Sequence, residues 1–440
     1  MVDAFDCDVL IAGAGTTGAA AAWACARRGL RVRCLERGAL DAAGARWVNG
    51  VPAWAFDEVG LDRPVAPEAH SSGGRFVMVS GWGPHRVDVD ASGLLDVDMR
   101  LLVARLQETA REAGAELEGG CGVRGFTPVA GGARVETDAG SLTARVVVDA
   151  TGLAGARLAG RRRPPRDELC AAAQEVRAIR DVPAAQAWCD AQQIRPGETV
   201  CFTGIEGGYS ILNVSVSLDG EHSRVAILTG SVPAAGHPSG QQILDRFVAE
   251  QPWVGDREFG GARAIPLTPP ADRLDHGPLV SLGDAGGQVF AAHGSGIASG
   301  LLAAAQLAEV ISAGGTPWDF NVRWQRTWGP SLLASNHFAR FSRSLSPEAL
   351  SAAFAGGLMP AGLARQTLLQ HPARPGPADL AQVLSGVVRQ PAVARRFLPV
   401  VFTMSRLERH QRRYPIAPTG LDRWIRKRNR WLGWSPERAD

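Results

Sequence analysis

The chain has 440 residues, 45% hydrophobic and 21% charged, enough to build two or three domain cores and too apolar for a disordered chain. Its net charge of +3 is too small to indicate nucleic-acid binding over the whole surface. Seven cysteines without a C-x-x-C pair argue against a disulfide framework or a zinc site, and they favour a cytoplasmic protein. No signal peptide, transmembrane segment or metal site is predicted.

The N-terminus predicts a strand, a tight turn, a helix and a second strand. The apolar run 7–12 has the length of a buried parallel strand, and the next residues open an alanine-rich helix that extends to about Arg28. A second strand over 30–35 ends at Glu36. This pattern is a βαβ unit of about thirty residues.

The turn of this unit carries a G-x-G-x-x-G motif. Gly13 permits the tight turn, Gly15 lets a diphosphate approach the backbone, and Gly18 lets helix and strand pack closely. The helix N-terminus offers free N–H groups to the diphosphate, and Glu36 stands where a carboxylate would bind an adenosine ribose. The motif alone is also compatible with an ordinary glycine turn, but its strand–helix–strand context predicts dinucleotide binding.

Further along the chain, 98–114 predicts an amphipathic helix, and strands are expected at 134–136 and 141–149. A basic, proline-containing link at 160–166 follows. Alternating residues from about 198 to 230 predict antiparallel sheet, with Asp219-Gly220 as a hairpin turn.

A second glycine-rich region follows the buried strand expected at 279–282. Gly283-Asp284 ends that strand, and Gly294-Ser295-Gly296-Ile297 opens a helix to about 311. Asp284 could accept a hydrogen bond from a ribityl hydroxyl, and the helix N-terminus could stabilise negative charge on a reduced flavin. A plain loop before a core helix of small residues is the alternative.

These three motifs, with Asp149-Ala150-Thr151-Gly152 as the middle one, resemble the FAD-dependent group that contains aromatic hydroxylases, geranylgeranyl reductases and flavin-dependent halogenases. The resemblance covers about residues 5–330. It implies an α/β fold: a Rossmann-like FAD-binding domain of glutathione-reductase type, an inserted antiparallel β-sheet substrate domain and a helical C-terminal region. The expected division is FAD-binding parts at 1–75, 98–165 and 265–330, substrate-domain strands at 76–97, a substrate sheet at 166–264 and helices with a basic tail at 331–440.

The resemblance also implies which residues hold the cofactor. They come from the three motifs and from the segments expected beside them: Gly13, Gly15, Thr16, Thr17, Gly18, Glu36, Arg37, Arg46, Arg100, Val123, Asp149, Thr151, Gly152, Gly283, Asp284, Gly294, Gly296 and Ile297. For Arg100, a solvated arginine on a helix face is the alternative.

The chain departs from the group in ways that bear on the chemistry. Proline is usual in the turn after Gly-Asp, but this chain has Phe290-Ala291-Ala292-His293 there, and the active-site cysteine of the geranylgeranyl reductases is missing between 37 and 60. Halogenases need an N-terminal lysine, and the only lysine here is Lys427. Halogenation is therefore rejected.

Few candidates remain for substrate chemistry. His293 could bind a substrate oxygen or act as an acid or base, or it could simply bond to the backbone of its turn. Arg46 is a second catalytic candidate, and Trp47, in the same loop, is a substrate-binding or a packing residue. The substrate pocket could be lined by Trp82, His85 and Tyr209, although packing is the more ordinary role for each of them.

Residues 404–434 hold nine basic and two acidic side chains, a net charge of +7 that leaves −4 for the rest of the chain. A solvated helix, a dimer contact and a dock for an acidic partner such as an acyl carrier protein all fit this tail. Nucleic acid would need a second basic element, which the sequence lacks.

The sequence as a whole predicts a cytoplasmic FAD enzyme of specialised metabolism that acts on an apolar or aromatic small molecule. Both a free and a carrier-protein-bound substrate fit this prediction, as do a monomer and an oligomer. Monooxygenation is the first expectation, with NAD(P)H as a transient reductant because no second dinucleotide motif follows a strand. The alternatives are a geranylgeranyl-reductase-like reductase or desaturase of an isoprenoid or polyene, and a non-redox cyclase or scaffold that binds flavin.

Overall fold

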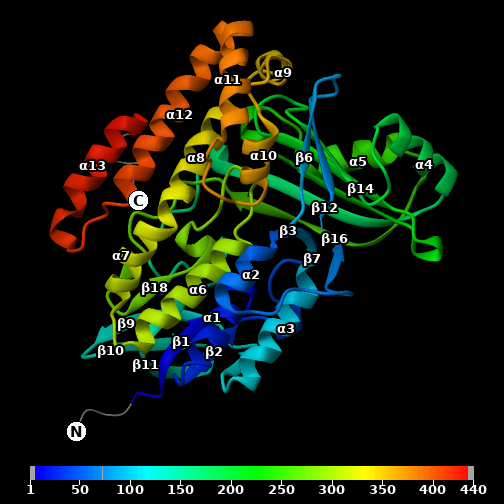
Figure 1. Cartoon of the computed structure of the whole chain (residues 1–440). Coiled ribbons are helices and arrows are strands. Elements are labelled where there is room, and N and C mark those ends of the chain that lie inside the picture. The colour runs from blue at the N-terminus through cyan, green and yellow to red at the C-terminus, as the bar shows by residue number, and fades with distance from the viewer. Residues whose placement is uncertain (1–4, 72, 435–440) are drawn as a thin grey trace.

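A computed structural model describes residues 5–71 and 73–434, and it contains two large sheets, one small sheet and a C-terminal group of helices (Figure 1). The sheet near the N-terminus lies at the bottom of the view, the second large sheet lies at the upper right, and the C-terminal helices run along the upper left. The predicted combination of a Rossmann-like domain, an antiparallel sheet domain and a helical C-terminal region is confirmed.

The first sheet is built around a parallel core. Its strands, in spatial order, are β17 (Asp275–His276), β18 (Leu279–Ser281), β11 (Gly140–Asp149), β1 (Cys7–Ala12), β2 (Val32–Glu36) and β8 (Glu116–Gly119). β1 is central and pairs in parallel with β2 and β11, so the carboxyl ends of these strands meet at one edge. β9 (Val123–Val129) and β10 (Gly132–Thr137) extend β11 as an antiparallel flap.

Helix α1 (Thr16–Ala26) lies between α6 (Ile297–Ser312) and α3 (Met99–Glu112). Ten of its eleven residues are buried, and most are alanine or glycine. Small side chains let α1 approach its neighbours closely, and a helix that is apolar all round must be buried. α3 is amphipathic as predicted, and it begins where the Asp98 carboxylate accepts a hydrogen bond from the backbone N–H of Arg100.

The second sheet has the order β16–β12–β15–β14–β13–β5–β6. Its strands are β5 (Arg75–Ser80), β6 (Arg86–Asp90), β12 (Leu169–Ile179), β13 (Thr199–Thr203), β14 (Ser210–Ser217), β15 (Arg224–Ser231) and β16 (Val254–Pro266). All pairs are antiparallel except β13 with β5. The hairpin expected near 219–220 joins β14 to β15, and α4 (Val182–Ala191) and α5 (Gly240–Glu250) accompany this sheet.

A small third sheet connects the two large ones. It contains β3 (Val48–Pro52), β4 (Ala69–Ser71) and β7 (Leu94–Asp98), with α2 (Ala53–Val59) following β3. Four of the five residues of β7 fall within 76–97, the range expected to form substrate-domain strands, but β7 pairs with β3 and β4.

Seven helices follow the second glycine-rich region. They are α7 (Pro317–Thr327), α8 (Gly329–Arg343), α9 (Pro347–Gly356), α10 (Ala361–Leu368), α11 (Pro377–Arg389), α12 (Pro391–Gln411) and α13 (Leu421–Leu432). α12 packs along α8, and α11 packs against α9 and α12. Within the described residues no helix is both long and apolar enough to cross a membrane. All seven cysteines are buried and free.

Candidate functional site

The first glycine motif brings the turn before α1 against the end of β11. Gly13 has a φ of +97°, and a methyl group built on it would lie 2.6 Å from the carbonyl oxygen of Ala150. A methyl group on Gly18 would overlap the Gly13 carbonyl. The N-terminus of α1 has Gly15 as its N-cap, no side-chain cap and no acidic residue in its first turn. Its backbone N–H groups are therefore suited to an anionic group.

Glu36 stands beside this turn at the end of β2. Its carboxylate accepts hydrogen bonds from the backbone N–H groups of Ala14 (2.9 Å) and Gly38 (3.2 Å). Arg37 lies against Gly122, next to the buried Val123 at the start of β9. Three of the predicted cofactor-binding residues, Glu36, Arg37 and Val123, are thus brought together, and Glu36 is the one predicted to bind the adenosine ribose.

The middle motif is held by its own aspartate. Asp149 is 1% exposed, and its carboxylate accepts hydrogen bonds from Thr151 N (3.1 Å), Thr151 Oγ1 (2.6 Å) and Leu158 N (2.8 Å). Through these hydrogen bonds Asp149 shapes the Ala150–Gly152 turn, which packs against Gly13. Its direct contact with a cofactor stays a prediction.

The third motif meets α1 from the other side. Gly283 has a φ of +62°, and a methyl group on it would lie 2.8 Å from Thr17 Oγ1. The Gln288 side chain accepts a hydrogen bond from Gly283 N at 2.7 Å and so fixes the turn. Asp284 Oδ1 lies close to Gly296, the N-cap of α6, which also lacks a side-chain cap. Burial raises the pKa of Asp284, and the nearby Arg263 guanidinium opposes that rise.

These residues fit a long dinucleotide cofactor. The N-termini of α1 and α6 both lack side-chain caps, and Thr17 joins them by contacting Gly283 and Gly300. Along the third motif, Ser281 Oγ, Gln288 Nε2 and Ser295 Oγ are buried without a hydrogen-bond partner in the protein. Buried polar atoms of this kind need partners, and a ribityl chain or flavin edge would supply them.

The loop after Glu36 covers the first motif. Gly44 lies within van der Waals distance of Gly15. Arg46, predicted to be catalytic, is exposed, and its guanidinium donates to the Asp41 carbonyl at 2.9 Å. Trp47 is buried, and its indole N–H has no hydrogen-bond partner. The structure therefore places Trp47 inside the molecule and Arg46 at its surface.

Arg100 is engaged at the start of α3. Its guanidinium donates to both carboxylate oxygens of Asp98, at 3.0 and 2.6 Å, and stacks 3.8 Å above the ring centroid of Phe259 on β16. This stacking joins α3 to β16 of the second sheet. A role toward the diphosphate stays a prediction.

Tyr209, which directly precedes β14, reaches the turn that carries His293. A methyl group on Gly294 would lie 2.8 Å from Tyr209 Oη, so the phenol reaches the residue next to His293. Burial lowers the pKa of His293 to about 4, and His293 Nδ1 lies 3.5 Å from Gln370 Nε2. Burial also raises the pKa of Tyr209 well above its usual range. At neutral pH the imidazole is therefore uncharged and the phenol keeps its proton.

The other predicted substrate residues lie elsewhere. Trp82 is 61% exposed in the turn between β5 and β6, and its ring stacks near Phe202 with centroids 5.0 Å apart. His85 lies in the same turn, where its carbonyl accepts a hydrogen bond from Ser80 N. Neither has a described contact with Tyr209 or His293.

Three residues of the site were not predicted. Gln174 on β12 makes two hydrogen bonds to the backbone of Val48, at 2.6 and 2.7 Å, and so fixes the strand after Trp47. Arg263 on β16 donates to the Gly44 carbonyl and faces Asp284. Gln370, with a positive φ of 58°, reaches His293 from beyond α10. Arg263 carried one usable signal, since it is the only charged residue in 259–266. Gln174 and Gln370 carried no such signal, because their hydrogen-bond partners are far away in the sequence.

Comparison with known proteins supports the same assignment. Residues 8–64 match a family described as FAD dependent oxidoreductase. Over 360 residues the chain is 28% identical to digeranylgeranylglycerophospholipid reductase 1 of Methanopyrus kandleri, covering 78% of this chain and 91% of that protein. The superfamily predicted from the sequence is confirmed. This chain is an FAD-dependent oxidoreductase.

Solved structures share the fold of this oxidoreductase. A geranylgeranyl bacteriochlorophyll reductase-like protein from Thermoplasma acidophilum has a TM-score of 0.68 at 16% identity, covering 90% of this chain and 99% of its own. A myxobacterial chondrochloren halogenase, described as a variant of FAD-dependent halogenases, has a TM-score of 0.57 at 17% identity, covering 87% and 96%. In this oxidoreductase the only lysine, Lys427, is exposed on α13, with its ammonium 5.5 Å from the ring centroid of Trp431.

Proposed function

We propose that this FAD-dependent oxidoreductase saturates carbon–carbon double bonds of an apolar isoprenoid or polyene. The observation that carries the proposal is the phenol of Tyr209, which lies against Gly294 at the N-terminal side of α6. Saturation of a double bond requires a hydride at one carbon and a proton at the other. Bound reduced FAD supplies the hydride.

The chain's own residues divide the remaining work. Tyr209 keeps its proton at neutral pH, so Oη can donate that proton to the substrate, although burial raises its pKa and makes the phenol a weaker acid than in water. His293 has a pKa of about 4 and carries no spare proton at neutral pH, so it serves as a neutral hydrogen-bonding group. The substrate would gain two hydrogen atoms, one as the hydride that bound reduced FAD would supply and one as the Tyr209 proton, and Tyr209 would recover its proton from solvent.

The residues that would hold the cofactor follow from the geometry. The N-terminus of α1 and the turn at Gly15 would hold the diphosphate, Glu36 the adenosine ribose, and Asp284 with the N-terminus of α6 the flavin end. Arg263 would compensate the buried charge of Asp284. Reduced nicotinamide dinucleotide remains the proposed source of electrons.

The environment of the turn suits an apolar substrate. A small cavity beside Phe290 is lined by Trp54, Leu302, Trp328 and Gln370, together with other side chains of α6 and α8. The cavity measures about 20 Å³, the room of one water molecule, so an isoprenoid chain would have to displace side chains there to reach its apolar lining. The lipid reductase from Methanopyrus kandleri, which matches most of the chain, supports the same choice.

The test uses the purified, FAD-loaded chain with flavin reduced by dithionite under argon and a polyprenyl alcohol as probe. Saturated product without oxygen supports the proposal. In heavy water two deuteriums should enter per double bond, because dithionite supplies only electrons and both hydrogen atoms then come from the solvent. Tyr209→Phe should lower the rate by about a hundredfold or more while FAD content is unchanged. Trp82→Phe, an exposed aromatic of the same domain, is the control. Full activity of Tyr209→Phe would contradict the role of Tyr209.

Monooxygenation of an apolar or aromatic molecule is the second candidate. It is supported by the half-buried His293 and Tyr209, whose imidazole and phenol could both hydrogen-bond a substrate oxygen at the turn of Gly294. This candidate requires oxygen, and NAD(P)H oxidation that speeds up when substrate is added. Oxygen incorporation under air with no anaerobic product would favour it over saturation, and activity with a redox-inactive flavin analogue would overturn both candidates.

A further inference from the structure

The outer side of the α11–α12 pair exposes large apolar side chains. We call this region the α11–α12 surface. It consists of Leu380, Leu384 and Val388 on α11, and Leu398, Val401 and Phe402 on α12. Val388 is 82% exposed and Phe402 is 73% exposed. Scattered exposed apolar residues are ordinary, but a set gathered on two packed helices indicates a contact surface.

The spacing of these residues places them on outward stripes. On α11 the three apolar residues recur every four positions. On α12 the residues Arg395, Leu398, Phe402, Arg406 and Arg409 recur every three or four positions, so they share one face. That face therefore combines apolar and basic side chains along the same stripe.

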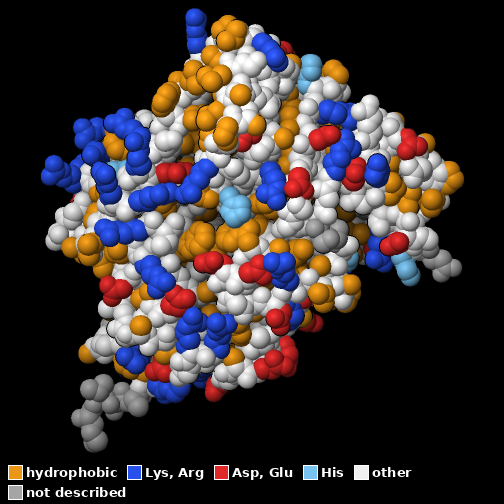
Figure 2. Space-filling model, viewed as in Figure 1, with side chains coloured by type: hydrophobic (Ala, Val, Ile, Leu, Met, Phe, Trp, Pro, Cys, Tyr) orange, Lys and Arg blue, Asp and Glu red, His pale blue; other side chains and the backbone are white. Residues whose placement is uncertain are grey.

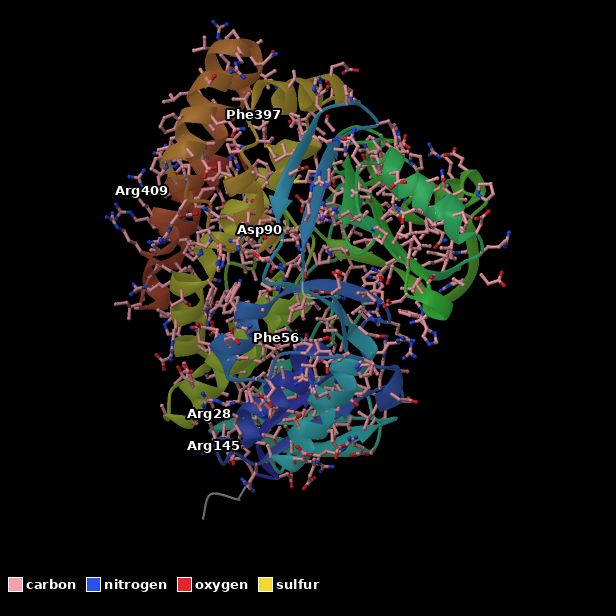
Figure 3. The ribbon with its side chains drawn as sticks, turned by 45° about the vertical axis from the view of Figure 1, so that its right-hand side comes forward. Arg28, Phe56, Asp90, Arg145, Phe397 and Arg409 are labelled. Atoms are coloured by element: carbon pink, nitrogen blue, oxygen red, sulfur yellow. The ribbon has the colours of Figure 1, made fainter. Side chains whose placement is uncertain are left out.

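The inner sides of the two helices are committed to the protein core. Ala394, Phe397 and Leu407 of α12 are buried, and the Phe397 ring packs edge-on against Phe341 at 4.7 Å between centroids. In Figure 3, Phe397 lies among the helices and Arg409 lies on the outer side of α12. The α11–α12 surface is thus an outward face on a packed support.

The surface continues into a strongly basic region. Exposed basic residues of α11 to α13 and their connections are Arg389, Arg395, Arg396, Arg406, Arg409, Arg412, Arg413, Arg423, Arg426, Lys427 and Arg430. Among residues 377–434 the only exposed acid is Asp422, and of the exposed basic residues only Arg412 forms an ion pair, with Glu408 at 3.9 Å. Figure 2 shows the apolar area over α11 and α12 and the basic area over α12 and α13.

We propose that the α11–α12 surface docks on the face of an anionic phospholipid bilayer. Apolar side chains on a helix enter the boundary between headgroups and acyl chains, while neighbouring arginines bind the lipid phosphates and keep their charge at the interface. The charge of the region matches an anionic surface, and apolar and basic residues on one stripe match the layered polarity of a bilayer edge. This inference does not depend on which reaction the enzyme performs.

The experiment measures co-sedimentation of the full-length, FAD-loaded chain with vesicles. Vesicles of phosphatidylcholine alone are compared with vesicles that also contain phosphatidylglycerol, at low and high salt. The chain should bind the anionic vesicles, and high salt should weaken binding because the electrostatic part is screened. Equal partitioning onto neutral vesicles, or no binding to anionic ones, would overturn the proposal.

Variants separate this surface from charge in general. Arg406→Glu with Arg409→Glu should lower partitioning by ~fivefold or more for each arginine, and Phe402→Ser with Val388→Ser should lower it further. The matched controls change exposed residues elsewhere, Arg134→Glu for charge and Val65→Ser, 73% exposed like Phe402, for apolarity. Flavin absorbance and the melting temperature report folding of each variant. The proposal is wrong if the surface variants still bind anionic vesicles, or if the chain binds an acidic carrier protein but not vesicles.

Discussion

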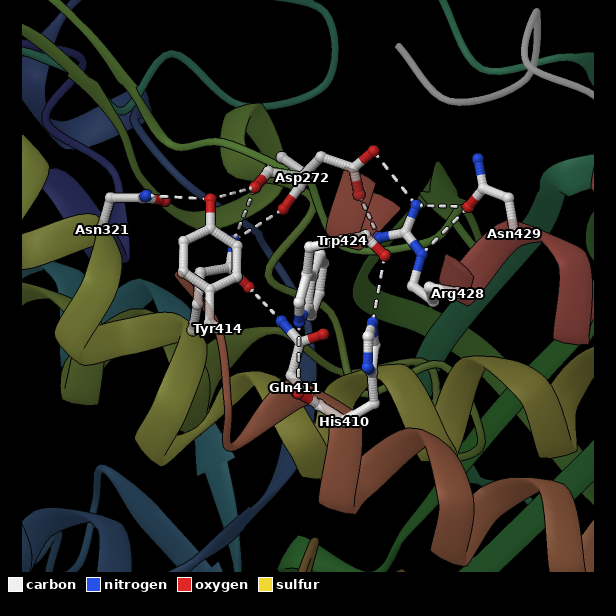
Figure 4. Close-up of polar contacts among 10 residues, drawn as sticks. Asp272, Asn321, His410, Gln411, Tyr414, Trp424, Arg428 and Asn429 are labelled. Carbon is white, nitrogen blue, oxygen red and sulfur yellow. Dashed lines mark hydrogen bonds and ion pairs between the residues drawn. The ribbon is translucent and has the colours of Figure 1, made fainter. Parts of the chain in front are cut away.

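The FAD-binding motifs and the C-terminal helices of this oxidoreductase are each stabilised by a different kind of contact. Around the FAD-binding motifs, glycine and alanine let backbones meet directly, as where Gly13 touches Ala150 and Gly283 touches Thr17. In the C-terminal helices, large polar side chains do the joining, and Arg428 on α13 reaches the Asp272 carboxylate in a buried pair (Figure 4). Substitutions that enlarge a side chain should therefore destabilise the FAD-binding motifs, and substitutions that shorten a side chain should destabilise the C-terminal helices.

The polar cluster beneath α13 contains more than one ion pair. Tyr414 Oη donates to the Asp272 carbonyl at 2.7 Å and accepts from Asn321 Nδ2 at 3.1 Å. The His410 ring stacks on Trp424, with centroids 4.4 Å apart. The basic tail thus uses part of its charge and aromatic content to attach to the rest of the molecule, and its exposed arginines form the outer surface.

The largest effect is expected from a single methyl group in the first motif. Gly18→Ala would place that group on the Gly13 carbonyl oxygen, and the strand and helix would have to separate. We expect a loss of more than about 4 kcal/mol in the free energy of unfolding, and a chain without yellow colour. Absorbance of bound flavin and denaturant melts measure both. Gly125→Ala, where the added group meets nothing within 4 Å, is the control, and a yellow, stable Gly18→Ala variant would refute the close-packing account.

The opposite change is expected to damage the tail. Arg428→Ala removes a guanidinium whose side chain is 3% exposed and leaves the Asp272 carboxylate, 12% exposed, without its charged partner. Breaking one partner of a buried pair costs about 3–4 kcal/mol. Arg426→Ala, an exposed neighbour, should change stability by less than about 0.5 kcal/mol.

The same variant tests whether the two regions are separate. Flavin bound per folded Arg428→Ala chain should equal that of the wild type, because Arg428 contacts the tail cluster and not the FAD motifs. Loss of flavin before loss of fold would show that the tail supports the cofactor site. The distinction between the two regions would then fail.

What could be predicted from the sequence follows this same division. The strand 7–12, the helix from Thr16, the strand at 279–281 and the helix from Ile297 were predicted within a few residues, because their signals are local: apolar runs, glycine turns and small-residue helices. The partners of Arg428 and Gln174 lie 156 and 126 residues away, so only the folded chain brings them together. The partner strands of β7 are likewise determined only in the folded chain: the alternation of its residues indicates a strand but does not show which sheet the strand joins.

The two regions meet at His293, where a pH effect is expected. The unfolded pKa is about 6.5 and the folded pKa about 4, because burial disfavours the charged imidazole. Between these values the unfolded chain binds a proton that the folded chain does not. The stability contributed by neutral His293 is therefore complete above pH 6.5 and is lost as the pH falls toward 4, by up to about 3 kcal/mol.

Denaturant melts of His293→Asn and wild type across this pH range measure that contribution. The variant should lose less stability on acidification, and the difference between the two proteins should vanish above pH 6.5 apart from a constant offset. His293→Gln should give the same acid slope as His293→Asn, because it also lacks the imidazole. Parallel slopes for His293→Asn and wild type would show that His293 is not the desolvated group.

The smallest expected effect removes one oxygen atom from the tail cluster. Tyr414→Phe keeps the fully buried ring but leaves the Asp272 carbonyl and the Asn321 amide without their shared partner. The Asp272 carbonyl keeps a long hydrogen bond from Gln325 Nε2 (3.4 Å), so one buried amide group is left unsatisfied. This costs about 1–2 kcal/mol, less than the broken ion pair because the amide carries no full charge. Adding Asn321→Leu should increase the loss, because it also removes the acceptor of the buried Leu274 N–H at 3.0 Å, and denaturant melts measure both variants. If Tyr414→Phe alone leaves stability unchanged, hydrogen bonding does not hold the tail, and the packing of Trp424 and Tyr414 must suffice.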